Sequence, residues 1–294
     1  MSESADAWET RGHRVPFDEG ELFVVDVHAS DDDRHDPLLV LHGFPTSSFD
    51  WHLVVHDLGR DRRVVLFDFP GFGLSWKPDR RYSIELYADA AEAVAQHCEL
   101  ETAALLTHDM GDTVGGELLA RDMERGLRFV VTGRVLTNGS IYIDQAQLTP
   151  GQEMLLAADD AVFDLAALGL DPEEGFRGGI AATFSEAHPP SDDDLDDAWR
   201  FASHADGHKL LARTIRYIED RRARESRYTG AIETHRAPLG VVWGQLDPVA
   251  VYAMAVQLVE RRPGTPLVTL GDVGHWPMLE APAELAAAAR AVLD

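Results

Sequence analysis

Short apolar runs, each bounded by turn-forming residues, recur through the first half of the chain. The runs at 37–42 (PLLVLH) and 63–69 (RVVLFDF) are almost continuously apolar, which is typical of strands buried on both faces of a sheet. The run at 21–28 (ELFVVDVH) alternates apolar and polar residues, so it predicts an edge strand or one arm of a hairpin. Two further runs, at 103–106 and 130–137, also predict strands in this half.

Helical patterns separate these runs. Apolar residues recur at helical spacing over 82–98, and small residues do so from position 113 onward. Strands that alternate with helices at this spacing predict right-handed βαβ units and a mostly parallel sheet. The alternation returns near the C-terminus, where we expect strands at 239–243 and 266–270 and helices at 251–261 and 281–293.

The alternation stops in the middle of the chain. From position 140 to about 234 the pattern is helical, irregular and rich in charge. The simplest architecture is an α/β protein with one doubly wound, mostly parallel sheet and a helical lid inserted after the sixth strand. In this prediction residues 1–138 and 236–294 form the core, and residues 139–235 form the lid.

The strand at 103–106 runs into a sharp strand-to-helix transition. Thr107 and Gly111 each lie two positions from Asp109. A strand that turns at once into a helix, with small residues beside the turn, is the geometry of a nucleophile elbow, in which a strained backbone presents one side chain above the end of the sheet. Serine is the usual residue at the apex. Here we predict that Asp109 occupies it.

Composition restricts the partners that we expect. The chain has 51 acidic and 26 basic residues and a net charge of −25, which disfavours binding to nucleic acid or to an anionic membrane. Such a surface favours solubility, or adaptation to high salt, where screening weakens self-repulsion. No run of about 18 apolar residues could span a bilayer. The N-terminal residues lack the apolar core of a signal peptide, so we expect a cytoplasmic protein.

Two features resemble sites of chemistry but have simpler interpretations. Cys98 is the single cysteine, so an intrachain disulfide is excluded, and its place on the apolar side of a predicted helix indicates a small buried side chain. The acidic turn at 31–33 lies near His28 and His35, but these residues lack a recognised metal-ligand spacing. We expect a solvated loop there, and neither a metal nor another cofactor in the protein.

Five segments, taken in order, resemble the landmarks of the α/β-hydrolase fold. More narrowly, they are similar to the branch with an aspartate nucleophile, which holds epoxide hydrolases and haloalkane dehalogenases. An animal member of the fold is the nearest match, through HGFPTSS, the HDxGD elbow and the LDP segment. The resemblance runs from about position 36 to the C-terminus. The segments are HGFPTSSFDW (42–51), FDFPGFGLS (67–75), THDMG (107–111), WGQLDP (243–248) and GHWPMLEAP (274–282).

The resemblance implies a catalytic triad. Asp109 would be the nucleophile, His275 the base, and Asp247 the acid that orients the His275 ring. The order nucleophile, acid, histidine is the order of this fold. The backbone N–H groups of Phe44 and Met110 would form the oxyanion hole. The simpler alternatives are a surface-loop histidine and a turn aspartate, although no acidic residue follows the sixth strand to compete with Asp247.

An aspartate nucleophile selects the reaction. A carboxylate that attacks an ester carbonyl gives an anhydride, whereas attack on a saturated, electrophilic carbon gives a stable alkyl ester. Water activated by His275 can then cleave that ester at the Asp109 carbonyl carbon. The sequence therefore predicts a cofactor-independent hydrolase that opens epoxides or displaces halide. The alternative is a degenerate elbow in a non-catalytic, ligand-binding member of the fold.

Residues near the elbow disfavour dehalogenase chemistry. Haloalkane dehalogenases hold the departing halide with an indole N–H after the nucleophile and a second tryptophan or an asparagine, but this chain has Met110 and Phe44 there. Fluoroacetate dehalogenases have arginines shortly after the nucleophile, where this chain has Asp112 and Thr113. Asp112 would also disfavour an anionic substrate if it faced the pocket. Carbon–halogen hydrolysis with an atypical halide site is therefore the second hypothesis.

Epoxide hydrolases use lid tyrosines to protonate the opening oxygen, and Tyr217 resembles one of them in its setting. Its alternative role is packing within a lid helix. The segment 163–165 offers Leu165 in place of the second tyrosine, and Tyr142 is a substitute nearer the start of the lid. With Trp276 beside the base, these residues predict a pocket for a neutral, moderately apolar small molecule.

Overall fold

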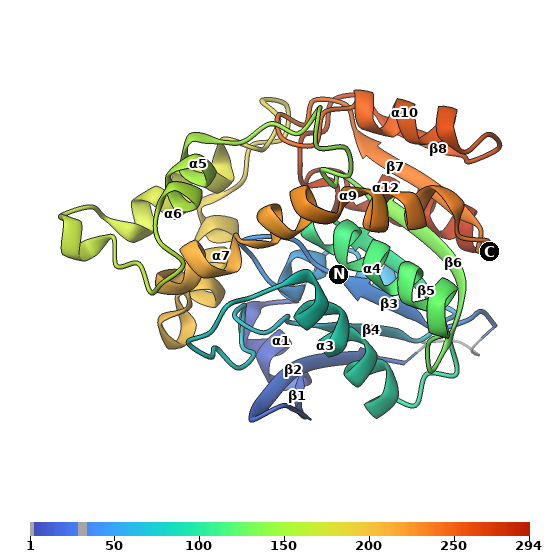
Figure 1. Cartoon of the computed structure of the whole chain (residues 1–294), viewed down its shortest axis with the longest axis horizontal. Coiled ribbons are helices and arrows are strands. Elements are labelled where there is room, and N and C mark those ends of the chain that lie inside the picture. The colour runs from blue at the N-terminus through green and yellow to red at the C-terminus, as the bar shows by residue number, and fades with distance from the viewer. Residues whose placement is uncertain (1–2, 29–33) are drawn as a thin grey trace.

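The computed structural model describes residues 3–28 and 34–294, so the acidic turn at 31–33 lies outside the described residues. Its centre is an eight-stranded sheet with the order β1-β2-β4-β3-β5-β6-β7-β8. Strands β3 to β8 are parallel, whereas β1 and β2 are antiparallel. The predicted α/β class with a mostly parallel sheet is confirmed (Figure 1). The strands are β1 (His13–Phe17), β2 (Gly20–Val27), β3 (Leu38–Leu41), β4 (Val64–Phe67), β5 (Thr102–His108), β6 (Val130–Thr137), β7 (Leu239–Gly244) and β8 (Leu267–Leu270).

The N-terminal edge of the sheet holds a strand that the apolar pattern did not predict. β2 pairs antiparallel with β1 on one side and with β4 on the other, so it is an inner hairpin arm and not the edge. The edge is β1, HRVPF, in which only Val15 is buried. It also contains Pro16, which a sheet tolerates on an edge strand because no ladder hydrogen bond is lost there. Because most β1 residues are exposed, the strand has no apolar run by which the sequence could predict it.

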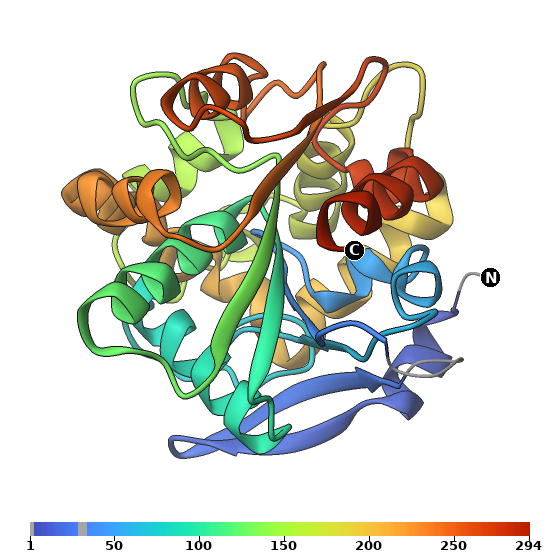
Figure 2. The same ribbon diagram turned by 90° about the vertical axis from the view of Figure 1, so that its right-hand side faces the viewer.

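Helices cover both faces of the sheet, and the strands supply side chains to two apolar cores. Along β3, Leu39 and Leu41 enter one core, whereas Leu38 and Val40 enter the other. The two-residue period of a strand therefore explains why this run is apolar throughout. Figure 2 shows the green helix α4 and the dark red helix α12 on opposite sides of the strands. The covering helices are α1 (Ala5–Arg11), α2 (Val55–Leu58), α3 (Ile84–His97), α4 (Met110–Arg125), α10 (Ala253–Arg261), α11 (Pro277–Glu280) and α12 (Pro282–Leu293).

Between β6 and β7 the described chain contains helices and turns and no strand, as the predicted lid requires. Figure 1 shows α5, α6 and α7 projecting to one side of the sheet. The last helix, α9, instead lies along α4 over the core. The boundaries 139–235 thus stay a prediction, with α9 joining the two parts. The helices are α5 (Pro150–Ala157), α6 (Pro172–Ala181), α7 (Asp192–Ser203), α8 (Leu211–Thr214) and α9 (Tyr217–Thr234).

Local sequence signals start the two lid helices that matter for the site. Thr149 and Gln152 form a capping box at α5, in which each side chain bonds the other's backbone N–H. Asp171 accepts hydrogen bonds from two backbone N–H groups at the start of α6, and Pro172 follows it as the first helical residue. Both helices therefore begin where a side-chain oxygen accepts hydrogen bonds from the first backbone N–H groups of the helix.

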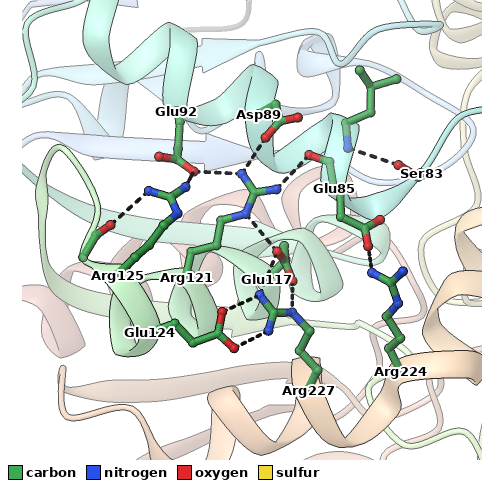
Figure 3. A network of polar contacts seen from close by, with 12 residues as sticks. Ser83, Glu85, Asp89, Glu92, Glu117, Arg121, Glu124, Arg125, Arg224 and Arg227 are labelled. Carbon is green, nitrogen blue, oxygen red and sulfur yellow. Dashed lines mark hydrogen bonds and ion pairs between the residues drawn. The ribbon is translucent and has the colours of Figure 1, made fainter.

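Ion pairs fix α9 against the core helices (Figure 3). Glu117 of α4 is buried, and its carboxylate accepts hydrogen bonds from Arg227 Nε at 2.6 Å and from Arg121 Nε at 2.8 Å. Arg121 in turn donates to Asp89 and Glu92 of α3, each within 2.8 Å. Because α4 begins directly after Asp109, the network fixes α9 relative to the elbow.

Two kinds of feature are absent from the described residues. No helix there is long and apolar enough to cross a membrane. No group of three or more His, Cys, Asp or Glu side chains in the described ranges is arranged to hold a metal ion. Cys98 follows α3, and burial raises the pKa of its thiol to about 11, so the thiol is protonated at neutral pH.

Candidate active site

Asp109 forms the apex of a sharp turn between β5 and α4. Its φ of 49° and ψ of −114° are rare for a residue with a side chain. Two glycines allow the turn. A Cβ on Gly43 would lie 2.7 Å from the Asp109 Cβ, and a Cβ on Gly111 would overlap the Leu41 carbonyl oxygen. The structure therefore has the strand-turn-helix geometry that the sequence predicts, with a carboxylate at its apex.

One backbone N–H group bonds this carboxylate, and the first N–H group of α4 follows Asp109 in the chain. The Phe44 N–H donates to Asp109 Oδ2 at 2.8 Å. Met110 is the first residue of α4, so its N–H has no acceptor within the helix. A helix N-terminus also stabilises nearby negative charge. Of the two residues predicted to form the oxyanion hole, Phe44 bonds the carboxylate and Met110 directly follows Asp109 in the chain.

His275 and Asp247 form a buried pair. The His275 Nδ1–H donates to Asp247 Oδ2 at 2.8 Å. The other Asp247 oxygen accepts from the backbone N–H groups of Val249 and Ala250, at 2.7 and 3.0 Å. Asn138, which follows β6, donates to Asp247 Oδ2 at 2.7 Å. The carboxylate is therefore held on both oxygens, and Asn138 is a site residue that the sequence did not indicate.

The surrounding charges hold a proton on His275. Burial lowers the pKa of the ring, but Asp247 and the charge of Asp109 outweigh burial and raise that pKa to about 9. The His275 ring is therefore an imidazolium at neutral pH, and it bonds Asp247. A buried histidine whose pKa is displaced by a specific charged neighbour is typical of an active site.

The loop that carries His275 is clamped by Glu280. One carboxylate oxygen of Glu280 accepts from Gly274 N at 2.8 Å and from Ser185 N at 3.0 Å, and the other accepts from Trp276 N at 3.0 Å. The backbone on both sides of His275 is thus fixed by one buried side chain. Ser185 lies beyond α6, so the same carboxylate also fixes the lid.

Thr183 makes a second connection between the lid and this loop. Its carbonyl accepts from the His275 N–H at 3.0 Å, and its hydroxyl accepts from the Trp276 indole N–H at 2.8 Å. On the other side, His108 Nε2 donates to the His275 carbonyl at 2.8 Å, which makes His108 a structural support. Neither Thr183 nor Glu280 carries a motif of its own. The one available signal was that Glu280 lies in the GHWPMLEAP segment.

A cavity of about 140 Å³ opens between this machinery and the lid. His275 is the one titratable side chain among its described lining residues, and the rest of the lining is mostly apolar. The predicted residues Phe44, Trp276 and Leu165 are part of the wall. Helices α5 and α6 supply much of the remainder, including Gln152, Met154, Leu155, Gly175, Phe176, Gly179 and Ile180.

Comparison with known proteins identifies the family. Residues 38–288 match the Alpha/beta hydrolase family. The chain belongs to this family. It is 37% identical to the putative hydrolase LipZ of Mycobacterium tuberculosis, with 99% of both chains covered. It is 33% identical to the mesoderm-specific transcript homolog protein of Homo sapiens, over 83% of this chain and 75% of that protein. An α/β hydrolase fold protein from Burkholderia ambifaria has a TM-score of 0.75 at 23% identity, over 94% and 96% of the two chains.

The animal member that the motifs resemble is the mesoderm-specific transcript protein, and the likeness is confirmed. LipZ is the more similar of the two relatives named above, and it extends over more of the chain. The assignment to the α/β-hydrolase family therefore rests on the whole chain and not on the motif segments alone. The aspartate-nucleophile branch is a separate, finer inference from Asp109.

In this α/β hydrolase, Tyr217 lies at the start of α9 and against the site. It is buried, and its ring centroid is 5.8 Å from that of Phe44. Its hydroxyl makes no hydrogen bond within the described chain. Burial and the charge of Asp109 raise the pKa of the hydroxyl well above its ordinary value. The effect of Asp109 indicates that the ring lies near the nucleophile, and both effects keep the hydroxyl protonated at neutral pH.

Four residues predicted or considered to act on the substrate do not line the cavity: Asp109, Asp112, Tyr142 and Tyr217. The Tyr142 hydroxyl donates to Glu233 of α9 at 2.8 Å. This placement corrects its predicted role as a substitute for the second lid tyrosine. Asp112 is buried beneath the elbow, where Thr107 donates to it and burial raises its pKa well above the ordinary value. It therefore does not face a substrate.

Proposed function

We propose that this α/β hydrolase acts through an aspartyl alkyl-enzyme ester on Asp109, and that its substrates are epoxides. One observation carries the proposal: the elbow presents a carboxylate that accepts a hydrogen bond from Phe44 N–H, beside the buried His275–Asp247 pair. A carboxylate in this position is suited to attack on a saturated carbon.

The first step is ring opening. An Asp109 oxygen attacks one epoxide carbon, a carbon–oxygen bond of the ring breaks, and the electron pair stays on the ring oxygen as an alkoxide. Tyr217 gives its hydroxyl proton to that alkoxide and becomes a tyrosinate. The buried position of Tyr217 near Asp109 supports this role.

The second step is hydrolysis of the ester. Once Asp109 is esterified, its charge no longer raises the pKa of His275, so the ring can release its proton to the tyrosinate, directly or through solvent, and become a base. His275 then takes a proton from water, and the hydroxide formed attacks the Asp109 carbonyl carbon. The N–H groups of Phe44 and Met110 stabilise the oxyanion. The diol leaves with the proton from His275. The Asp109 carboxylic acid that remains then gives its proton to His275, which restores the carboxylate and the imidazolium.

The cavity supports a neutral, moderately apolar substrate. Its described lining has no arginine or lysine that would attract an anion, and its volume of about 140 Å³ limits substrate size. The second tyrosine of epoxide hydrolases has no counterpart here, since Leu165 lines the cavity in its expected segment. Tyr217 would therefore act as the single proton donor.

Covalent trapping tests the proposal. His275→Gln should accumulate the ester, so intact mass should increase by the whole mass of the epoxide. Asp109→Ala should form no adduct, and His28→Gln, at an exposed histidine, should turn over like wild type. In ¹⁸O-labelled water, a wild-type single turnover should place the label in Asp109, because water attacks its carbonyl carbon.

The same measurements separate the competing functions. An adduct with haloalkanes that lacks the halogen, and none with epoxides, would assign dehalogenase chemistry to the elbow. No turnover and no adduct in either substrate panel would leave a ligand-binding protein. Tyr217→Phe should slow ester formation from epoxides; unchanged rates would exclude it as the proton donor.

A further inference from the structure

Arg221 of α9 is a buried cation with no hydrogen-bond or ion-pair partner among the described residues. It is 3% exposed, it makes no hydrogen bond or ion pair within the described chain, and its Nε and Nη1 atoms are buried and unpaired. Carboxylates are abundant in a chain with 51 acidic and 26 basic residues. The absence of one beside Arg221 is therefore a property of this position and not of the composition.

Its neighbours on the same helix are paired. Arg224 pairs with Glu85 of α3, and Arg227 pairs with Glu117 of α4 (Figure 3). The other arginines buried in the described structure also have acceptors: Arg62 and Arg121 bond carboxylates, Arg134 bonds three backbone carbonyls, and Arg216 bonds both kinds of group. A buried, unpaired charge lowers the stability of a protein, so its presence calls for a function.

Arg221 faces Tyr217. The two residues lie one helical turn apart, and the guanidinium carbon is 5.4 Å from the centre of the Tyr217 ring. The titratable and charged groups that act on this ring are Asp109 from the elbow, Tyr87 from α3 and Arg221 itself. Burial and Asp109 raise the pKa of the Tyr217 hydroxyl, whereas Arg221 opposes them and lowers it.

We propose that Arg221 is a positioning residue whose unpaired charge stabilises Tyr217 as a tyrosinate after that side chain has given its proton to the opened ring oxygen. The inference rests on the proposed function. The O–H bond of Tyr217 breaks, the proton forms an alcohol with the alkoxide, and the negative charge remains on the phenolate beside Arg221. A cation over the ring attracts the phenolate more strongly than the neutral phenol.

This role explains why Arg221 has no carboxylate beside it. A paired arginine would already be neutralised, and its effect on Tyr217 would be small. The price is lower stability, so replacement of Arg221 by an apolar residue of similar length should raise the resistance of the fold to urea. A residue that served only to hold α9 in place would behave in the opposite way.

Titration of Tyr217 tests the proposal without a substrate. A fluorinated tyrosine at position 217 has a more acidic hydroxyl, and its ¹⁹F resonance reports ionisation. In Arg221→Met the midpoint should rise by about one pH unit or more, whereas Arg221→Lys should keep most of the wild-type value. Arg222→Met is the matched control, because Arg222 is the exposed neighbour, and it should leave the midpoint unchanged.

A double-mutant cycle tests the consequence for the reaction. Arg221→Met should slow ester formation from epoxides by about 10-fold, and the loss should disappear in a Tyr217→Phe background. Circular dichroism should confirm the fold of each variant, and Arg221→Gln replaces Arg221→Met if the latter does not fold.

The two tests distinguish failure of this inference from failure of the proposed function. A wild-type protein without activity on epoxides would remove the proposed function, and the ¹⁹F titration would still decide whether Arg221 acts on Tyr217. An unmoved midpoint in Arg221→Met would overturn the inference. The inference would also be overturned if Arg221→Met slowed ester formation equally in the wild-type and Tyr217→Phe backgrounds.

Discussion

The side-chain amide of Asn138 lies 2.7 Å from Asp247 Oδ2, the same oxygen that meets His275 Nδ1 at 2.8 Å. Asn138 also accepts a hydrogen bond from Gly244 N at 2.9 Å, so its orientation is fixed by β7. An amide at this position donates a hydrogen bond to Asp247 without adding a charge of its own.

Replacement of Asn138 should weaken the acid–base pair. Asn138→Ala removes a buried donor to the Asp247 carboxylate, so the free energy of unfolding should fall by about 1–3 kcal/mol and kcat should decrease. Asn138→Asp should cost more, because it places a second carboxylate beside Asp247, and the loss should diminish at low pH. Urea unfolding and kcat at two pH values check both expectations; equal effects of the two substitutions would contradict the electrostatic account.

The raised pKa of His275 links stability to pH. The folded pKa of about 9 exceeds the ordinary value of 6.5, so protonation favours the folded state. This contribution is fully present below pH 6.5 and is lost as pH rises through about 9. We expect His275→Gln to cost more stability at pH 6 than at pH 9.5, by roughly 3 kcal/mol at most. Urea unfolding of both proteins measures the difference, and a pH-independent difference would refute the prediction.

Asp50 should affect stability with its own pH dependence. Burial raises its pKa to about 8, although Thr46 donates a hydrogen bond to it at 2.6 Å. The folded state therefore prefers the protonated form, and stability is lost as pH rises from the ordinary value of 3.8 through about 8. Asp50→Asn should be nearly neutral at pH 4 and stabilising by about 1 kcal/mol or more at pH 9. Destabilisation at pH 9 would be the contrary result.

Glu280 should matter for ester hydrolysis more than for ester formation. Glu280→Gln keeps the shape of the side chain but replaces one carboxylate oxygen, which accepts a backbone N–H, with an amide N–H₂, which cannot accept one. The loop around His275 should therefore be held less firmly. Because His275 acts on water and not on the epoxide, the burst of adduct should persist while steady-state turnover falls by about 10-fold. Glu284→Gln, at an exposed position in α12, is the control. A smaller burst with unchanged turnover would exclude this role.

Gly179 should set the size of the substrate. It lines the cavity from α6, and an added Cβ would meet no atom within 4 Å. Gly179→Leu should raise KM for bulky epoxides by about 10-fold, because the added side chain prevents one or two carbon groups of the substrate from being buried in the cavity. KM for small epoxides should not change. Gly178→Leu lies on the same helix outside the lining and controls for the change in helix propensity. Equal KM changes in both variants would contradict a steric wall.

The sequence predicted the parts of the site that depend on local pattern. The elbow around Asp109 has a signature because a strained turn permits few residues. His275 bonds Asp247, and the charge of Asp109 acts on the His275 ring. The sheet followed from buried runs, except for β1, whose exposed residues and proline carry no such signal. Each of these features depends on residues that are close together in the sequence.

Contacts between distant segments could not be predicted in this way. Thr183 reaches Trp276, and Arg221 lies buried without a carboxylate, only because the lid and α9 pack where they do. Tyr142 was misassigned for the same reason. Its position soon after β6 suggested the pocket, but the chain turns and the hydroxyl meets α9 at Glu233. The direction that the chain takes after β6 cannot be predicted from a single sequence.

The bonds from Thr183 and Ser185 to the His275 loop limit how this protein can be recombined. By sequence these two residues belong to the segment between β6 and β7, but by hydrogen bonding they belong with residues 274–280. In a chimaera that receives this segment from another family member, the loop that carries His275 would pack against residues other than Thr183 and Ser185. The unit of exchange is therefore the pair of segments, 183–185 together with 274–280, and not the inserted helices alone.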